Sequence, residues 1–469
     1  MTGTHLIDLT ARRALAALLA AVVVLASGCG GGGTAPEVIA DSTPSISTPL
    51  PTVAPTPIST PAATAAPALT ATPVATAAPA LTATPVATAS PAPTATPVAT
   101  ASPAPTATPV PTAFSTPDPT PSTEPEPWHA QLAFTGDLLS HGPVFRQARA
   151  NGSDDLAYDF RPMFELVQET LSDADLAICH LETPLSPDNR GLSGYPLFNA
   201  PGDLAIAIAQ AGYDGCSTAS NHSMDQGIAG IENTLDLFDK AGLGHAGMAR
   251  TALEAANPSL YSVNGVTIGH LSYTYGLNGL VLPDDKPWAV HVISAQDILQ
   301  EARAAIELGA EFVVLSIHWG AEYQVAPTSQ QRALAKELLA GDEIDLIVGT
   351  HAHVIQPVER LGGNLVIYGL GNFLSNQSPQ SCRSCPSEST DGVIVLVDLV
   401  EGELGDLEVA AISAVPTWVD RRTFAIVDVG AALAADSLPE LTSQLEQSWA
   451  RTTTTLRSYG VAVMFTGQP

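Results

Sequence analysis

Basic and aromatic residues are both scarce in this sequence, which has 18 Lys and Arg residues against 47 Asp and Glu, and only 5% aromatic residues. No basic stripe is present that could neutralise the phosphates of a nucleic acid, so we expect no nucleic-acid partner. The low aromatic content gives little support to an adhesin, which would expose aromatic patches. A Gly-rich phosphate loop of the Walker type is also missing, so we expect ATP-driven ligation to belong to another protein.

Long apolar runs are missing as well. The segment 14–26 is too short to cross a bilayer as a helix, which needs about 20 residues. It follows Arg12 and Arg13 and ends in small residues, a pattern typical of a secretory signal. The letters ASGC that end at Cys29 resemble a bacterial lipobox, whose cysteine becomes the lipidated first residue of the mature protein. We therefore expect 1–29 to be a lipoprotein-type signal peptide and membrane lipid to be a partner through Cys29; the alternative is ordinary cleavage and a soluble secreted product.

The next segment, 30–127, consists mainly of Pro, Thr, Ala and Ser and repeats a twelve-residue unit close to PAxTATPVATAx. It has no bulky apolar face to bury, and frequent proline favours extended polyproline II. We predict a disordered stalk that holds the working domain outside the cytoplasm, on the cell membrane. A folded domain at 128–415 and a C-terminal extension at 416–469 follow the stalk.

Four further cysteines lie in the folded region. Cys382 and Cys385 are separated by two residues in a polar loop, and in an extracytoplasmic protein this spacing favours a local disulfide over half of a zinc site. Cys179 and Cys216 lie in predicted strands, where we expect unpaired thiols buried as small hydrophobic side chains.

Apolar periodicity predicts alternating strands and helices, and hence an α/β domain with a largely parallel sheet and an antiparallel continuation at its end. The predicted strands are 131–135, 175–179, 214–218, 266–273, 311–317, 346–348, 364–369 and 393–399. The predicted helices are 162–172, 202–210, 228–241, 295–308, 330–339 and 441–457.

Polar residues follow several of these strands at the point where each ends. The clearest case is DLIVGTHAHV at 345–354, in which a short apolar run exits into two histidines, and imidazole suits divalent transition metals. The full set is Asp137, Glu182, Asn221, His222, His318, His351 and His353. Each residue alone has an ordinary explanation as a turn former, a solvated side chain or a core histidine. Together, on the edge where open α/β sheets bind their ligands, they predict a site.

The ordered motifs GD, HLE, SNH, HWG, GTHAHV and GNF resemble the CapA family, which is associated with bacterial poly-gamma-glutamate capsule synthesis, and through it the calcineurin-like metallophosphoesterases. The resemblance covers about 131–399. It implies a four-layer αββα sandwich of two sheets flanked by helices, and two divalent metal ions, Mn, Fe or Zn. It also implies as partners an anionic capsule polymer and the capsule synthesis machinery.

The resemblance also implies roles for individual residues. Asp137 would bind the first metal, Glu182 would bridge, Asn221 and His318 would serve the second metal, and His351 and His353 would complete the two sites. His222 matches the histidine that protonates the leaving group. Residues for substrate contact or for support of the ligands are His141, His180, Trp319 and Asn372.

The sequence departs from the phosphoesterase pattern at several places. Leu139 stands where a metal-binding histidine is usual, so His141 would have to turn in to complete the first site; Glu182 replaces an aspartate, and His180 and Ser220 replace asparagines. The expected chemistry is metal-dependent hydrolysis of a phosphoester or related bond. The alternative is a non-catalytic polymer-handling or scaffold protein whose metal centre is structural or vestigial.

Overall fold

A computed structural model describes residues 128–403 and 405–467. The predicted signal peptide, the stalk and Cys29 lie outside these residues. Within the described part of the chain, no helix is both long and apolar enough to cross a membrane.

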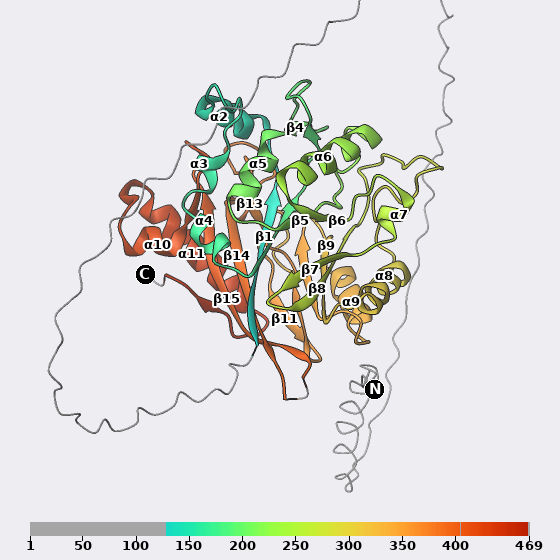
Figure 1. Cartoon of the computed structure of the whole chain (residues 1–469). Coiled ribbons are helices and arrows are strands. Elements are labelled where there is room, and N and C mark those ends of the chain that lie inside the picture. Colours follow the sequence, from blue (N-terminus) through green and yellow to red (C-terminus); the bar gives the residue numbers. More distant parts are fainter. Residues whose placement is uncertain (1–127, 404, 468–469) are drawn as a thin grey trace, which may run out of the picture. The chain divides into compact units, whose positions relative to one another are not determined.

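The first sheet is built around β1 (His129–Leu138), whose central position is visible in Figure 1. In order across the sheet the strands are β16 (Ile426–Asp428), β15 (Leu407–Val419), β14 (Asp391–Glu401), β1, β2 (Leu176–Leu181), β5 (Gly215–Ser217) and β6 (Gly244–Ala246). Two short strands pair off this path, β13 (Asn372–Leu374) with β1 and β17 (Met464–Phe465) with β15. From β1 to β6 the strands are parallel, while β14, β15 and β16 continue the sheet antiparallel, as predicted.

The second sheet is smaller. Its order is β11 (Val358–Leu361), β12 (Asn364–Ile367), β10 (Leu346–Thr350), β9 (Phe312–His318), β8 (Val266–Thr274) and β7 (Ser259–Val263), with β8, β9, β10 and β12 parallel. A separate pair, β3 (Leu185–Ser186) and β4 (Ala200–Pro201), lies outside both sheets.

The two sheets pack face to face through alternate residues of their strands. Leu132 and Phe134 of β1 share one buried cluster with Val314 of β9 and Leu346 of β10. Ala133, between them in sequence, belongs instead to the cluster that packs against helices. This alternation is what a strand with two buried faces requires, because successive side chains point to opposite sides.

Helices cover the outer face of each sheet. The first sheet carries α2 (Gly142–Asn151), α3 (Arg161–Phe164), α4 (Gln168–Ser172), α5 (Asp203–Gln210) and α6 (Gly227–Ala241). The second carries α8 (Ala295–Glu307) and α9 (Ser329–Leu338). Beside the C-terminal strands lie α10 (Val429–Ala434) and α11 (Thr442–Arg457), and shorter helices are α7 (Ala252–Ala255), η1 (Ser387–Thr390) and η2 (Pro439–Leu441). The predicted four-layer αββα fold is therefore confirmed (Figure 1).

One helix that was predicted as continuous is interrupted in the structure. The segment 162–172 forms two short helices, α3 and α4, separated by a turn. Val167 leaves helical backbone angles, with φ −123° and ψ −1°, and its side chain is buried in the same cluster as Phe164. Core packing therefore interrupts a pattern that has helical spacing.

Both cysteine pairs form disulfides. The Cys382–Cys385 bond confirms the prediction from spacing. Cys179 and Cys216 are buried, as predicted, but the prediction that they act only as small hydrophobic side chains is wrong, since they are bonded to each other. They are direct partners in the parallel pairing of β2 with β5, so their side chains leave the sheet on the same face, with Cα atoms 4.4 Å apart.

Candidate metal centre

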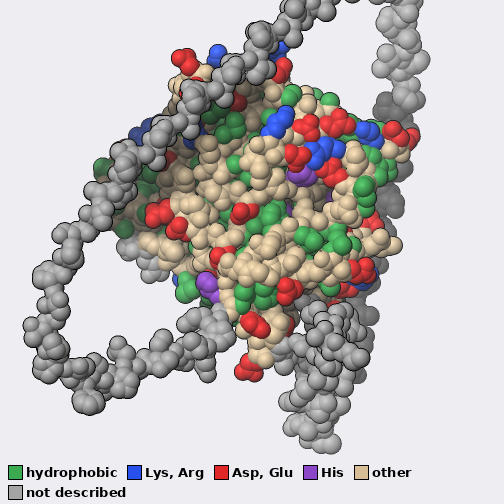
Figure 2. Space-filling model, in the orientation of Figure 1, with side chains coloured by type: hydrophobic (Ala, Val, Ile, Leu, Met, Phe, Trp, Pro, Cys, Tyr) green, Lys and Arg blue, Asp and Glu red, His purple; other side chains and the backbone are tan. Residues whose placement is uncertain are grey.

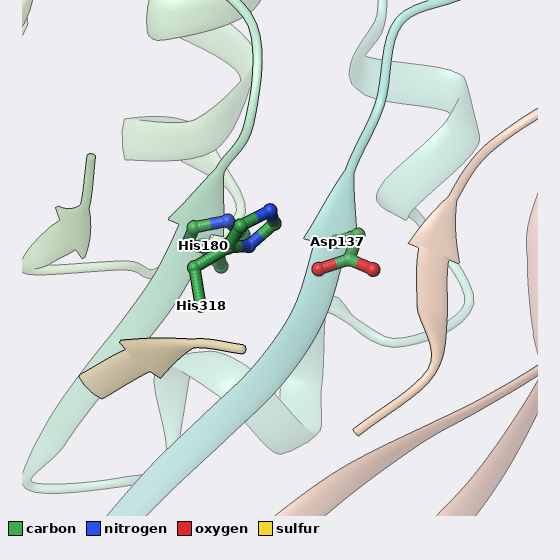
Figure 3. Close-up of side chains that lie close together, drawn as sticks. All are labelled: Asp137, His180 and His318. Atoms are coloured by element: carbon green, nitrogen blue, oxygen red, sulfur yellow. The ribbon is translucent and has the colours of Figure 1, made fainter. Parts of the chain in front are cut away.

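Strands from both sheets end at one place and bring buried carboxylates and imidazoles together there. Asp137 and His180 come from β1 and β2 of the first sheet, and His318 comes from β9 of the second. Figure 3 shows the Asp137 carboxylate on one side and the stacked His180 and His318 rings on the other. The potential ligand atoms of these three residues lie within 4.8 Å of one another, and so do those of a second set, Asp137, Glu182 and His353.

Asp137 belongs to both sets and is held from two sides. Its backbone N–H donates to the Gly371 carbonyl at 3.0 Å. That contact requires glycine at position 136, where a Cβ would lie 1.9 Å from the Gly371 oxygen. Its carboxylate accepts hydrogen bonds from His353 Nδ1 at 2.8 Å and from the His351 backbone N–H at 3.4 Å. Burial opposes ionisation, but the hydrogen bond and charge of His353 outweigh it and lower the pKa of Asp137.

His353 carries the complementary shift. Burial disfavours its charged form, yet the negative charge of Glu182 and the hydrogen bond to Asp137 raise the pKa of His353 to about 9. Both His351 and His353 have left-handed backbone conformations, with φ of 87° and 54°. Such strain at non-glycine residues is concentrated at functional sites.

Glu182 is the least satisfied group in the cluster. Its side chain is buried, and in the part of the chain that the structure describes neither carboxylate oxygen has a hydrogen-bond partner. Two imidazole nitrogens face Glu182 Oε1, His353 Nε2 at 3.8 Å and His318 Nε2 at 4.0 Å. Burial raises the pKa of Glu182 well above its ordinary value. Since an unpaired buried carboxylate is costly, Glu182 is a candidate metal ligand.

Two imidazole nitrogens are unpaired in the same place. His180 bonds Ser217 Oγ through Nδ1 at 2.8 Å, which leaves Nε2 without a partner, and His351 Nδ1 is also without one among the described residues. Burial lowers the pKa of His180 to about 4 and that of His351 to about 3. Both rings are therefore neutral near pH 7, which is the form that binds metals.

His318 and Asn221 meet across the two sheets. Asn221 Oδ1 lies 3.0 Å from His318 Nε2, and the opposite ring nitrogen of His318 lies 3.0 Å from Thr350 Oγ1. Burial lowers the pKa of His318 well below its ordinary value. The Asn221 oxygen and the neutral His318 nitrogen face one another, so one ion could engage both.

The donor set fits divalent metal ions. Carboxylate, amide and imidazole groups converge with orphaned atoms on Glu182, His180 and His351, and oxygen with imidazole donors suits Mn, Fe and Zn. In the first set His180, rather than His141, stands with Asp137 and His318. The sequence predicted His180 only as a supporting or substrate-contacting residue.

His222 lies beside the cluster in a different bonding arrangement. Its Nδ1 is 2.7 Å from Asp225 Oδ2, and its Nε2 is 3.5 Å from Asn278 Nδ2. The Phe198 ring packs edge-on against the imidazole, with centroids 4.7 Å apart. The sequence reasoning missed Asp225, although the His-x-x-Asp spacing within SNHSMD was a signal for it.

The remaining predicted residues take three different positions. His141 hydrogen bonds through Nδ1 with the Leu139 carbonyl at 3.0 Å, and burial lowers its pKa to about 4. Asn372 donates through Nδ2 to the carbonyls of His353 and Ser389, so it braces the histidine loop. Trp319 is buried in the core on the helix side of the second sheet, where its Nε1 donates to the Tyr368 carbonyl at 3.0 Å.

A cavity of about 380 Å³ opens beside the cluster. Its wall includes His141, His222, Glu322, Tyr323, His353 and Arg383. The cavity therefore joins residues of the cluster, through His353, with His222.

Comparison with known proteins matches residues 131–377 to the family described as bacterial capsule synthesis protein PGA_cap. The PGA biosynthesis protein CapA of Bacillus subtilis (strain 168) is 28% identical over 293 residues, which cover 60% of this chain and 70% of that protein. The capsule biosynthesis protein CapA of Bacillus anthracis is 31% identical over 184 residues, 38% of this chain and 44% of that one.

Among solved structures, the sulfate thiohydrolase SoxB of Thermus thermophilus aligns with a TM-score of 0.37 and 13% identity, over 69% of this chain and 61% of that one. The family match covers more than half of the present sequence and spans every strand end of the candidate metal centre. The chain therefore belongs to the bacterial capsule synthesis family PGA_cap.

Proposed function

We propose that this domain is a metal-dependent hydrolase that cleaves a phosphoester or a related bond during the synthesis or export of a capsule polymer. The single observation that supports this most strongly is Glu182, a buried carboxylate with both oxygens unpaired between two sets of potential ligands. Relatives named for PGA and capsule biosynthesis support the process, and the cluster supports the chemistry.

Two divalent metal ions would be held by Asp137, Glu182, His180, His318, His353 and the neighbouring Asn221 and His351. When bound, such ions act as Lewis acids and make water a nucleophile at neutral pH. Asp137, whose pKa is lowered, and the neutral rings of His180 and His351 are in the states that bind metals, whereas His353, whose pKa is raised to about 9, would have to release a proton to act as a ligand.

His222 would act as the general acid. Asp225 accepts the Nδ1–H of His222, and this directs the other ring nitrogen, Nε2, toward the cavity as the atom that delivers a proton to the departing oxygen. A positioned general acid contributes roughly 10²–10⁴ in rate. Asn278 Nδ2, 3.5 Å from Nε2, can donate to Nε2 only when that nitrogen carries no proton, so this contact belongs to the form of His222 that has delivered its proton.

The test is hydrolysis of bis(4-nitrophenyl) phosphate and 4-nitrophenyl phosphate after dialysis against chelator, with and without added Mn²⁺. We expect Mn²⁺-dependent turnover by the wild type. His318→Ala and His353→Ala should lose metal content and thermal stability together. His222→Ala should keep its metal and lose roughly 10²–10⁴ in rate. Full metal occupancy in both ligand variants would refute the assignment.

One observation favours the second candidate, a non-catalytic polymer-handling protein with a structural metal. Leu139 stands two residues after Asp137 and is buried, while His141 is held by the Leu139 carbonyl. Bound metal without turnover of either phosphoester would select this second function.

We also propose that the mature protein is a membrane lipoprotein outside the cytoplasm, anchored through Cys29. The sequence before Cys29 supports this, because an apolar segment that follows two arginines ends in small residues just before the cysteine. Cys29→Ala should release the processed protein from membranes, and membrane retention of that variant would refute the lipid anchor.

A further inference from the structure

One wall of the cavity is a small loop closed by the Cys382–Cys385 disulfide. Cys382, Arg383 and Ser384 of this loop line the same cavity as His222 and His353. A substrate whose reacting bond lies at the candidate metal centre would therefore extend along this loop. The roles proposed for the metal ligands and for the general acid give this loop no function.

Arg383 is a cation without a protein partner. It is exposed, and in residues 128–403 and 405–467 its side chain makes no hydrogen bond or ion pair. Arg250, by contrast, bonds Asp236, Asp239 and Glu254. An unpaired guanidinium is unexpected in a chain with 47 acidic and 18 basic residues, and Figure 2 shows acidic side chains scattered across the visible face of the domain.

The loop that carries Arg383 is held in place by hydrogen bonds from neighbouring side chains. The partly buried Arg421 guanidinium donates to the carbonyls of Ser375 and Gln377, at the start of the loop. Asn372 donates to Gln377 Oε1 at 3.1 Å, and the Tyr323 hydroxyl lies 3.5 Å from Cys385 Sγ. The disulfide then restricts the four residues that end the loop. Such preorganisation lowers the entropy lost when Arg383 is fixed by a ligand.

We propose that Arg383 binds an anionic group, a phosphate or a carboxylate, that the substrate carries next to the bond that is cleaved. Arginine suits this role because its planar guanidinium forms paired hydrogen bonds to either oxyanion. Among the described residues of the cavity wall the acidic side chain is Glu322, which would repel a second anionic group and so orient the substrate. This inference rests on the proposed function and adds a specificity residue to it.

The kinetic test compares two aryl phosphodiesters of equal reactivity, bis(4-nitrophenyl) phosphate and an analogue with a carboxylate on the ring that does not leave. The wild type should prefer the carboxylated diester by about tenfold in kcat/KM, the size expected for one charge-assisted hydrogen-bonded contact. Arg383→Ala should remove this preference through KM rather than kcat, and Arg383→Lys should retain part of it.

Three further variants sharpen the test. Glu322→Gln should strengthen the preference for the carboxylated diester, and Cys382→Ser with Cys385→Ser should weaken it, because the loop is no longer closed. Arg360→Ala is the matched control, since Arg360 lies on β11 and is not among the residues that line the cavity. Equal preference in Arg383→Ala and the wild type would overturn the inference.

A binding measurement separates this inference from the proposed function. Calorimetry with a non-hydrolysable phosphonate analogue of the carboxylated diester, in the presence of Mn²⁺, needs no turnover. If the wild type hydrolyses neither diester but binds the phosphonate more tightly than Arg383→Ala does, the anion site is supported and the hydrolase function is refuted. Hydrolysis with equal phosphonate affinity in both proteins, or no binding by the wild type, would refute the anion site.

Discussion

Two carboxylates are buried in this domain under opposite conditions, Glu182 at the strand ends and Asp391 beneath α11. Both Asp391 oxygens accept hydrogen bonds from Arg451, at 2.6 and 2.7 Å. Glu182 has no hydrogen-bond partner among the described residues, and the imidazole nitrogens of His353 and His318 lie 3.8 and 4.0 Å from its Oε1. The first arrangement is complete within the protein, while the second leaves both oxygens of Glu182 available to a cation. Two equally buried carboxylates thus differ in their surroundings, which make one a structural group and the other a candidate ligand.

The largest expected effect comes from breaking the complete pair. Arg451→Ala should lower the free energy of unfolding by about 3–5 kcal/mol, because it leaves the Asp391 charge buried and unpaired. Denaturant unfolding measures this loss. The matched control is Arg303→Ala, which removes a surface pair with Glu343 and should change stability by no more than about 1 kcal/mol. Equal losses of unfolding free energy in the two variants would show that the burial of Asp391 does not determine the size of the loss.

The second effect comes from Glu182→Gln. Wild-type protein at a Mn²⁺ concentration of about 100 Kd should gain about 2.7 kcal/mol over the chelated form, since ligand binding stabilises the native state. The variant should lose most of this gain, while its metal-free form should be no less stable than metal-free wild type, because an unpaired buried carboxylate is gone. Thermal melting with and without chelator provides the comparison. A metal-induced shift of wild-type size in the variant would exclude Glu182 as a ligand.

A third effect concerns His270, a buried histidine on β8 whose Nε2 lies 2.9 Å from Ser316 Oγ. Burial lowers the pKa of His270 to about 3, below its unfolded value of about 6.5. The unfolded chain therefore takes up the proton more readily, and stability from neutral His270 is full above pH 6.5 and falls as pH decreases. Between pH 6.5 and 5 the free energy of unfolding should fall by about 2 kcal/mol less in His270→Gln than in the wild type. Parallel pH–stability curves for variant and wild type would contradict this.

The smallest effect tests the position of Trp319. Trp319→Phe should cost about 1 kcal/mol, because it removes the hydrogen bond to the buried Tyr368 carbonyl and keeps most of the packing. Its Mn²⁺-induced stabilisation should equal that of the wild type. A reduced metal shift would instead place Trp319 in support of the ligands, as the sequence suggested.

The strand ends could be predicted because each is a local event, an apolar run followed by polar residues. What could not be predicted depends on lateral pairing between strands. Cys179 meets Cys216 only because β2 and β5 pair in that register, and Ser217 of the same strand bonds His180. The strand β15 was missed although it is the longest in the first sheet; Pro416 within it is a poor signal for a strand interior.

The contact between Gly136 and Gly371 has a consequence for sequence change. A Cβ at position 136 would overlap the Gly371 carbonyl, and a Cβ at position 371 would lie 2.6 Å from the Asp391 carbonyl. The GD and GNF motifs, more than two hundred residues apart, are thus in contact, and each glycine is required for its own reason, position 136 by the Gly371 carbonyl and position 371 by the Asp391 carbonyl. In a library randomised at both positions, we expect nearly every folded variant to have glycine at 136 and at 371.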